Sequence, residues 1–183
     1  MSLALLLIDI QNDYFPGGTM EVAGAKAAAA KASALLAAFR EKSLPIIHIQ
    51  HIAARPGATF FLPNTPGAEI HASVRPLAGE PVFQKHFPSS FRQTPLLDHL
   101  WQENISRLLI AGMMTQMCID TTVRAAADLG FSCLLAHDAC AARALTFNGR
   151  EVGAEDVHAV YCAALGGLFA KVLPTDELLA DLS

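Results

Sequence analysis

Continuous apolar runs of strand length are the feature that most constrains the fold of this chain. Residues 3–8, 108–112 and 131–136 are almost wholly apolar. Strands with one solvent-facing side alternate apolar and polar residues, so unbroken runs like these are typical of parallel strands covered on both faces. The Ala-rich segment 23–42, which lies between two such strands, predicts a helix. We therefore expect an α/β fold, with a mostly parallel sheet and helices on both faces.

The same patterns predict an ordered series of elements. Expected strands cover residues 3–8, 45–51, 81–85, 106–111, 131–137 and 171–173, and expected helices cover 23–42, 94–104, 116–129, 155–168 and a terminal segment from Thr175. Residues 53–81 carry repeated Pro-Gly turns and predict a long loop, either a substrate lid or an arm between subunits. Residues 143–156 are expected to form a polar loop. No internal repeat or linker divides the chain, so a single domain over residues 1–183 is predicted.

Composition and charge argue against several classes of partner. The net charge is −4 and no basic cluster occurs, which argues against nucleic acid and anionic membranes. No apolar run has the roughly 18 residues needed to cross a bilayer, and no secretory signal is recognisable, so a cytoplasmic protein is expected. The four cysteines lack zinc or C-x-x-C spacing and are expected to be free thiols. The apolar content of 52% favours burial between subunits, most simply in a homodimer.

Three chemically reactive side chains stand at or just beyond the ends of predicted strands. They are Asp9, Lys85 and Cys118. Ligand sites in open α/β sheets lie outside the carboxyl ends of the strands, although each charge alone could be a solvated loop end. Cys118 is expected in the first turn of a helix, where backbone N–H groups and the helix dipole favour the nucleophilic thiolate. The alternative is a buried apolar cysteine. Together the three residues predict a catalytic site.

Five motifs, in this order along the chain, carry a resemblance to a known family. They are residues 7–14 with Gly17 and Gly18, residues 66–70, Lys85 with residues 89–91, residues 112–118, and Asp138 with Ala139. In these motifs the chain resembles the isochorismatase-like cysteine hydrolase family, which includes the nicotinamidases. The resemblance covers nearly the whole sequence. It implies a Rossmann-like three-layer αβα sandwich with six strands.

The resemblance also implies roles for particular residues. The family's Asp-Lys-Cys triad falls on Asp9, Lys85 and Cys118. A non-proline cis peptide is implied between Met113 and Met114. The backbone N–H groups of Met114 and Cys118 are then expected to form an oxyanion hole.

One departure from the family concerns metal binding. Metal-dependent nicotinamidases carry an Asp-x-His pair after the second strand, and here Gln50 and Ile52 take those two places. His48, His51 and His71 are present, but no carboxylate accompanies them. We therefore predict no metal and no other cofactor. His48 is expected to be an ordinary strand residue and His51 to lie at the rim of the pocket.

The resemblance and the reactive residues together predict a hydrolase of a small-molecule substrate. A cysteine nucleophile suits cleavage of an amide C–N bond through a thioester, with Asp9 as base and Lys85 as the stabilising charge. Two alternatives are an isochorismatase-type hydrolase of a non-amide substrate and an inactive binding or scaffold member of the fold. Candidate pocket residues, which could equally be ordinary core, are Phe15, Gln50, His51, Phe60, Phe91 and Met117.

Overall fold

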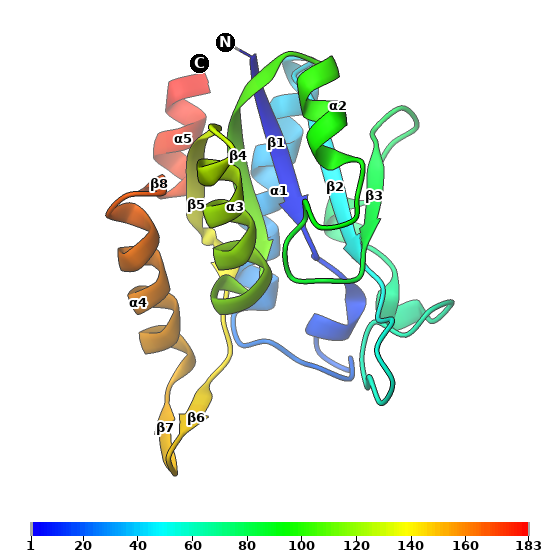
Figure 1. Cartoon of the computed structure of the whole chain (residues 1–183), viewed down its shortest axis with the longest axis vertical. Helices are drawn as coiled ribbons and strands as arrows, with labels where there is room; N and C mark the ends of the chain where they lie inside the picture. Colours follow the sequence, from blue (N-terminus) through cyan, green and yellow to red (C-terminus); the bar gives the residue numbers. More distant parts are fainter. Residues whose placement is uncertain (1, 183) are drawn as a thin grey trace.

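Six parallel strands form the central sheet of the computed structural model, which describes residues 2–182 (Figure 1). Their spatial order is β3-β2-β1-β4-β5-β8, and every neighbouring pair is parallel. The strands are β1 (Ser2–Ile8), β2 (Ile46–His51), β3 (Val82–Lys85), β4 (Ile105–Met113), β5 (Ser132–Ala141) and β8 (Ala170–Leu173). The predicted α/β fold with a six-stranded parallel sheet is thereby confirmed.

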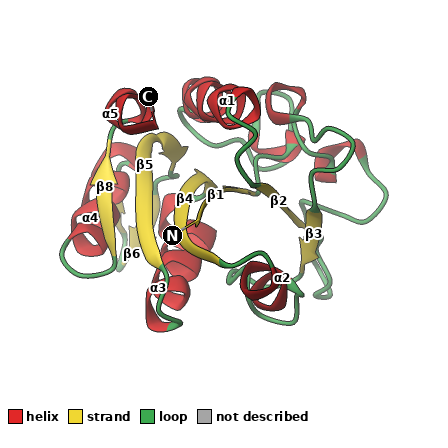
Figure 2. Cartoon of the chain, turned by 90° about the horizontal axis from the view of Figure 1, so that it is seen from above, coloured by secondary structure: helices red, strands yellow, loops and turns green. Residues whose placement is uncertain are grey.

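Helices cover both faces of this sheet (Figure 2). One face carries α1 (Ala25–Glu41) and α5 (Thr175–Leu182), and the other carries α2 (Leu96–Gln102), α3 (Asp120–Asp128) and α4 (Ala154–Gly166). Leu5 and Leu7 of β1 pack in the core beneath α1, while Leu6 and Ile8 pack on the opposite side with α2 and α3. This double coverage explains the unbroken apolar run of β1. No helix within residues 2–182 is both long and apolar enough to cross a membrane.

Two predicted loops contain more structure than expected. The prediction of a polar loop at 143–156 was wrong. In this segment, β6 (Leu145–Phe147) and β7 (Arg150–Val152) form an antiparallel hairpin that projects from the body (Figure 1). Asn148 and Gly149 connect them with φ values of 50° and 74°, as a two-residue hairpin turn requires. The long loop after β2 also contains two 3-10 turns, Pro66–Ala68 and Ala72–Val74.

Candidate active site

The carboxyl ends of four adjacent strands bring the predicted catalytic residues together. Asp9 directly follows β1, Lys85 ends β3, and Cys118 follows β4 in the π-helix η4 (Thr115–Ile119). β2 lies between β1 and β3 in the sheet, and its last residue, His51, is in register with Lys85. The ligating atoms of Asp9, His51 and Cys118 all lie within 4.8 Å of one another. The three residues predicted from strand ends therefore share one site, with His51 beside them.

Asp9 and Lys85 form an ion pair that is removed from solvent. Lys85 Nζ lies 2.7 Å from Asp9 Oδ2, and both side chains are fully buried. The ammonium also donates to the carbonyl oxygens of Phe87 and Pro88, at 3.1 and 3.0 Å. No backbone N–H or hydroxyl group within residues 2–182 donates to either carboxylate oxygen of Asp9. Asp9 is therefore paired with the Lys85 ammonium, and its carboxyl oxygens keep lone pairs that can accept a proton.

The backbone around Asp9 has an uncommon conformation. Asp9 has a φ of 52°, in the left-handed region, which Asp tolerates better than most residues but which still costs free energy. Gly112 of β4 lies opposite Ile8, and a Cβ atom at this position would collide with the carbonyl oxygen of Ile8. A glycine is therefore required for β4 to pass this close to the end of β1. Such outliers concentrate at functional sites.

Cys118 is held by a tight turn that wraps around Met114. The carbonyl oxygen of Met114 accepts from the N–H groups of Met117 and Ile119, at 3.0 and 3.3 Å. The peptide bond between Met113 and Met114 is cis, as the family resemblance implied. The predicted regular helix at 116–129 begins one residue earlier, as this π-helix, and continues as α3. The thiol of Cys118 lies within hydrogen-bonding reach of both Asp9 and Lys85.

The protonation states of the three groups follow from burial and mutual charge. Burial, and then the Asp9 carboxylate, raise the pKa of the Cys118 thiol far above its ordinary value, while Lys85 partly opposes them. This corrects the sequence-based expectation of an easily ionised thiol, because desolvation outweighs the helix terminus. Burial lowers the pKa of Lys85, but the neighbouring Asp9, and the Cys118 sulfur whenever it is ionised, raise it above its ordinary value. At rest Cys118 is therefore a thiol beside an ammonium.

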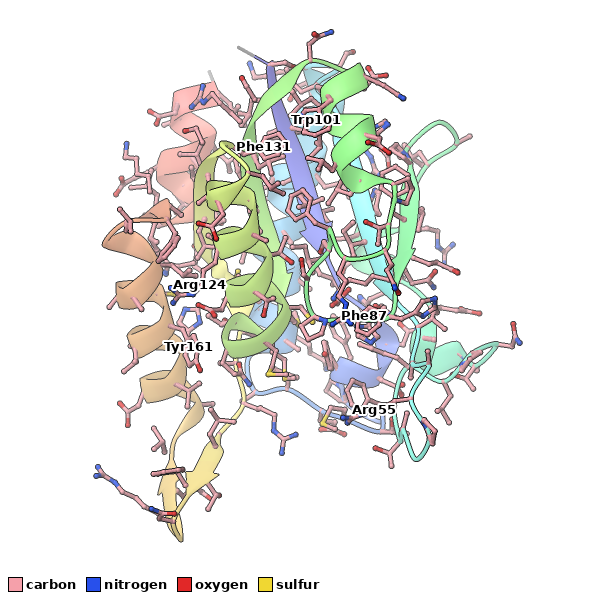
Figure 3. The ribbon with its side chains drawn as sticks, in the orientation of Figure 1. Arg55, Phe87, Trp101, Arg124, Phe131 and Tyr161 are labelled. Carbon is pink, nitrogen blue, oxygen red and sulfur yellow. The ribbon has the colours of Figure 1, made fainter. Side chains whose placement is uncertain are left out.

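A cavity of about 300 Å³ opens next to Cys118. Its walls come from the loop after β1, the loops that follow β2 and β3, and the turn η4. Two of the lining residues, Arg55 and Phe87, are labelled in Figure 3. Burial also raises the pKa of Tyr14 in this wall, so its phenol stays protonated. The lining residues are Tyr14, His51, Ala53, Ala54, Arg55, Ala58, Phe60, His86, Phe87, Pro88, Met114, Met117 and Cys118. The cavity is thus largely apolar, with the thiol exposed at one point of its wall.

Comparison with known proteins places this chain in a family. An isochorismatase domain model matches residues 3–176. The chain belongs to the isochorismatase family. It is 48% identical over 179 residues to the uncharacterized isochorismatase family protein YddQ of Bacillus subtilis, covering 98% of this chain and 99% of that one. A solved structure of an isochorismatase hydrolase from Oleispira antarctica has a TM-score of 0.94 at 47% identity, covering 98% of this chain and 96% of the other. A nicotinamidase/pyrazinamidase of Mycobacterium tuberculosis is 29% identical over 150 residues, covering 70% of this chain and 81% of that one.

Three of the six candidate pocket residues of this isochorismatase-family chain line the cavity. These are His51, Phe60 and Met117. The other three lie elsewhere because each has a different packing partner. Phe15 stacks on His71, with ring centroids 3.6 Å apart, and Phe91 stacks on Phe131 at 6.1 Å. Gln50 donates to the carbonyl oxygen of Ala68 at 2.8 Å and faces a different hollow.

Several cavity residues of the isochorismatase-family site were not predicted from the sequence. Tyr14 belongs to the first motif, and its position directly after the Asp9 strand was the available signal. His86 directly follows Lys85, and its position beside that proposed catalytic residue was the available signal. Arg55 lies in the long loop after β2, and only the folded path of that loop brings it to the cavity.

The histidines considered for metal binding do not converge. His48 is hydrogen-bonded to Glu80 at 2.9 Å, and His71 to Ser73 at 2.9 Å. Within residues 2–182, the group of three close candidate ligands is Asp9, His51 and Cys118. The ammonium of Lys85 already occupies this place, 2.7 Å from Asp9 and 3.4 Å from His51 Nδ1. A metal ion would have to compete with that charge, and the absence of a metal stays a prediction.

Proposed function

We propose that this isochorismatase-family hydrolase cleaves the C–N bond of a small carboxamide through a thioester on Cys118. The observation that carries the proposal is the buried thiol of Cys118, which lies within reach of the Asp9–Lys85 ion pair and lines a cavity of about 300 Å³. A relative named as a nicotinamidase/pyrazinamidase supports amide chemistry on this fold. The four free cysteines support a reducing, cytoplasmic setting.

The first half-reaction begins from a protonated thiol. Asp9 takes the Cys118 proton as Sγ bonds to the substrate's carbonyl carbon, and Lys85 stabilises the negative charge that develops on sulfur. The carbonyl oxygen becomes an oxyanion. The N–H groups of Met114 and Cys118 are the proposed donors to it, and one such donor typically stabilises the transition state by ~3–4 kcal/mol.

The second half-reaction restores the enzyme. The C–N bond breaks, the leaving amine takes the proton held by Asp9, and an acyl thioester remains on Cys118. Asp9 then removes a proton from a water molecule, whose oxygen attacks the thioester carbon. The C–S bond breaks, the carboxylic acid leaves, and the proton on Asp9 returns to the Cys118 sulfur.

The test is a screen of small carboxamides for release of ammonia or amine, followed by mass spectrometry of acid-quenched turnover. We expect an acyl adduct on the Cys118 peptide and loss of turnover in Cys118→Ala. Cys133→Ala is the matched control, because Cys133 is a buried free thiol in β5. Fast turnover of a non-amide substrate by Cys118→Ala, without an adduct, would favour the isochorismatase-type alternative. Ligand binding with no turnover of any substrate would favour a binding protein.

A further inference from the structure

Asp9, the proposed base, lies behind the cavity wall. Both of its carboxylate oxygens are closed off from solvent, and among residues 2–182 the wall includes neither Asp9 nor Lys85. The leaving amine and the attacking water lie in the cavity, because the substrate meets Cys118 there. A proton held by Asp9 therefore needs a path to these two molecules.

His51 is a cavity residue that also contacts the buried ion pair. Its Nδ1 lies 3.4 Å from Lys85 Nζ, which in turn lies 2.7 Å from Asp9 Oδ2. Its ligating atom is within 4.8 Å of those of Asp9 and Cys118. The imidazole therefore connects the two sides of the wall.

The other titratable groups in the wall are less suited to this task. Burial raises the pKa of Tyr14 well above its ordinary value, so its phenol holds its proton. Arg55 is permanently charged and can only donate hydrogen bonds. His86 directs its Nδ1 to the carbonyl oxygen of Ile52, at 2.8 Å. An imidazole, by contrast, can accept a proton at one nitrogen while it gives one from the other.

The protonation of His51 fits such a transfer. Burial is the largest cause that lowers its pKa, and the charges of Lys85, His86 and Arg55 lower it further against the opposing effect of Asp9, so the ring is neutral at pH 7. The ammonium of Lys85 offers only donors, so Nδ1 is the acceptor and the proton is on Nε2. No hydrogen bond occupies Nε2 within residues 2–182, and its N–H group is free for a molecule in the cavity.

Gln11 fixes the position of this imidazole. Gln11 is fully buried, and its Oε1 accepts from the backbone N–H of His51 at 2.7 Å. Its Nε2 donates to the carbonyl oxygen of His51 at 2.8 Å. The side-chain amide thus holds the His51 backbone on both sides. Gln11 belongs to the first sequence motif, and this clamp is a role for it that the triad does not supply.

We propose that His51 is a further catalytic residue, which relays protons between the Asp9–Lys85 pair and the molecules in the cavity. This inference rests on the proposed amide hydrolysis. As the C–N bond breaks, its electron pair stays on nitrogen, and the nitrogen takes the proton of His51 Nε2. Lys85 gives a proton to His51 Nδ1 and receives the one that Asp9 took from Cys118. Lys85 remains an ammonium, and His51 remains neutral with its proton now on Nδ1.

The second half-reaction runs the relay in reverse. As the water oxygen attacks the thioester carbon, a water proton passes to His51 Nε2. The Nδ1 proton returns through Lys85 to Asp9, and from there to the Cys118 sulfur as the C–S bond breaks. His51 ends with its proton on Nε2, as it began, so one turnover leaves the relay unchanged.

The experiment compares the best carboxamide of the screen with p-nitrophenyl acetate. The ester releases a stable phenolate, so acylation of Cys118 by it needs no proton from His51, whereas the later attack of water does use the relay. In His51→Gln, kcat for the carboxamide should fall about 100-fold or more, as is typical for loss of general acid–base catalysis. The burst of p-nitrophenolate should keep its wild-type rate, while steady-state ester turnover falls and acyl-Cys118 accumulates in the mass spectrum.

His99→Gln is the matched control, because it makes the same change at a partly buried histidine of α2, outside the cavity. It should keep both activities. In His51→Gln, a burst slowed as much as amide turnover would show a structural role and overturn the relay. Unchanged amide and ester turnover would also overturn the relay and leave the amidase function standing.

Failure of the proposed function has a different signature. A wild type that hydrolyses the ester but no carboxamide would contradict the amidase function. Accumulation of acyl-Cys118 in His51→Gln would then still support the relay for the water step, and its absence would overturn the relay. A wild type that forms no acyl adduct on Cys118 with either compound would contradict both.

Discussion

At the scale of single residues, Asp9 has two opposing effects on Cys118. Its negative charge raises the pKa of the thiol, and its free lone pairs make it the proposed acceptor of the thiol proton. Asp9→Asn removes both effects while keeping the side-chain shape. We expect the pKa of the Cys118 thiol to fall, because the neutral amide no longer opposes the thiolate, while turnover drops about 100-fold or more.

The measurement is the pH-dependence of iodoacetamide alkylation of Cys118, set beside turnover of the same protein. Lys85→Met is the control of opposite sign, because loss of the ammonium should raise the pKa of the thiol further. Asp9→Asn with undiminished turnover would contradict the role of Asp9 as base. Alkylation that shifts to higher pH in Asp9→Asn would contradict the charge interaction.

The grouping of Asp9, Lys85 and Cys118 could be predicted from the sequence because the ends of apolar strands can be recognised in it, whereas the protonation state of the thiol could not. Asp9 and Lys85 each stand where an apolar run stops, and parallel strands bring such positions to one edge. The pKa of Cys118 depends instead on desolvation by loops distant in sequence. Phe15 and Phe91 were misplaced for a related reason. The distance of an aromatic residue from a motif along the sequence does not indicate the direction in which its ring points. Phe15 stacks on His71 and Phe91 stacks on Phe131, away from the cavity.

At the scale of elements, α4 supports the turn that carries Cys118, the proposed nucleophile. Thr115, the first residue of η4, is fully buried, and its Oγ1 lies 2.9 Å from Nδ1 of His158 in α4. Thr115→Val keeps the side-chain shape and removes this hydrogen bond, which is worth about 1 kcal/mol. We expect kcat to fall several-fold with little change in KM, since the turn positions Cys118 and does not hold the substrate. Steady-state kinetics give this split.

Thr115→Ser is the control for this hydrogen bond, because it retains the hydroxyl group. Its kcat should stay near that of the wild type, with at most a small loss of thermal stability. Equal losses of kcat in the Ser and Val variants would show that the methyl group, and not the hydrogen bond, supports the turn.

A second network joins α1, β2 and the turn before β3. Glu80 accepts from Arg40 of α1 at 2.7 Å and from His48 of β2 at 2.9 Å. Arg40, chiefly, lowers the pKa of Glu80 from 4.5 to about 2. A carboxyl group with a lowered pKa stabilises the folded state at pH values above its unfolded-state pKa. This stabilisation is lost as the pH falls from 4.5 toward 2. Glu80→Gln should therefore destabilise the protein at pH 7 by about 1–2 kcal/mol, after allowance for partial solvent screening.

Urea denaturation at pH 7 and at pH 3 checks this prediction. The difference in unfolding free energy between the wild type and Glu80→Gln should shrink at pH 3, because Glu80 is then protonated in the unfolded chain while its pKa of about 2 keeps it largely ionised in the folded protein. Glu103→Gln is the matched control, because Glu103 is exposed and carries no ion pair within residues 2–182. A difference that is the same at both pH values would contradict the charge-based explanation.

Secondary structure was predicted correctly where the pattern of apolar residues was strong. It was predicted wrongly where a turn sequence was overlooked. The apolar run of β4 and the Ala-rich pattern of α1 predicted both elements to within two residues at each end. The hairpin β6–β7 was missed although Asn148-Gly149 is a strong hairpin signal, because its strands are only three residues long and exposed. The π-helix at Cys118 has no such signature in the sequence.

At the scale of the whole molecule, α4 and the hairpin leading into it lie at one edge of the molecule (Figure 1) and carry exposed apolar residues. Phe147 at the hairpin tip is 76% exposed, and Val160 and Leu168 on and after α4 are 63% and 83% exposed. A two-stranded hairpin that projects alone is marginally stable in water. Exposed apolar patches of this kind mark interaction surfaces. These residues define the hairpin–α4 face, which is a candidate contact surface.

We propose that a second copy of this chain covers the hairpin–α4 face in a two-fold dimer. Arg150 of the hairpin and Glu155 in the first turn of α4 flank the apolar residues, and neither has an ion-pair partner within residues 2–182. A two-fold axis would bring charges of opposite sign on the two copies toward each other, as a self-complementary interface requires.

Light scattering at micromolar concentration should show twice the chain mass of 19.5 kDa. Phe147→Asp combined with Leu168→Asp should give the monomer, whereas Trp101→Gln, a control at an exposed apolar residue on α2, should remain dimeric. A monomeric wild type, or a double variant that stays dimeric, would contradict this interface.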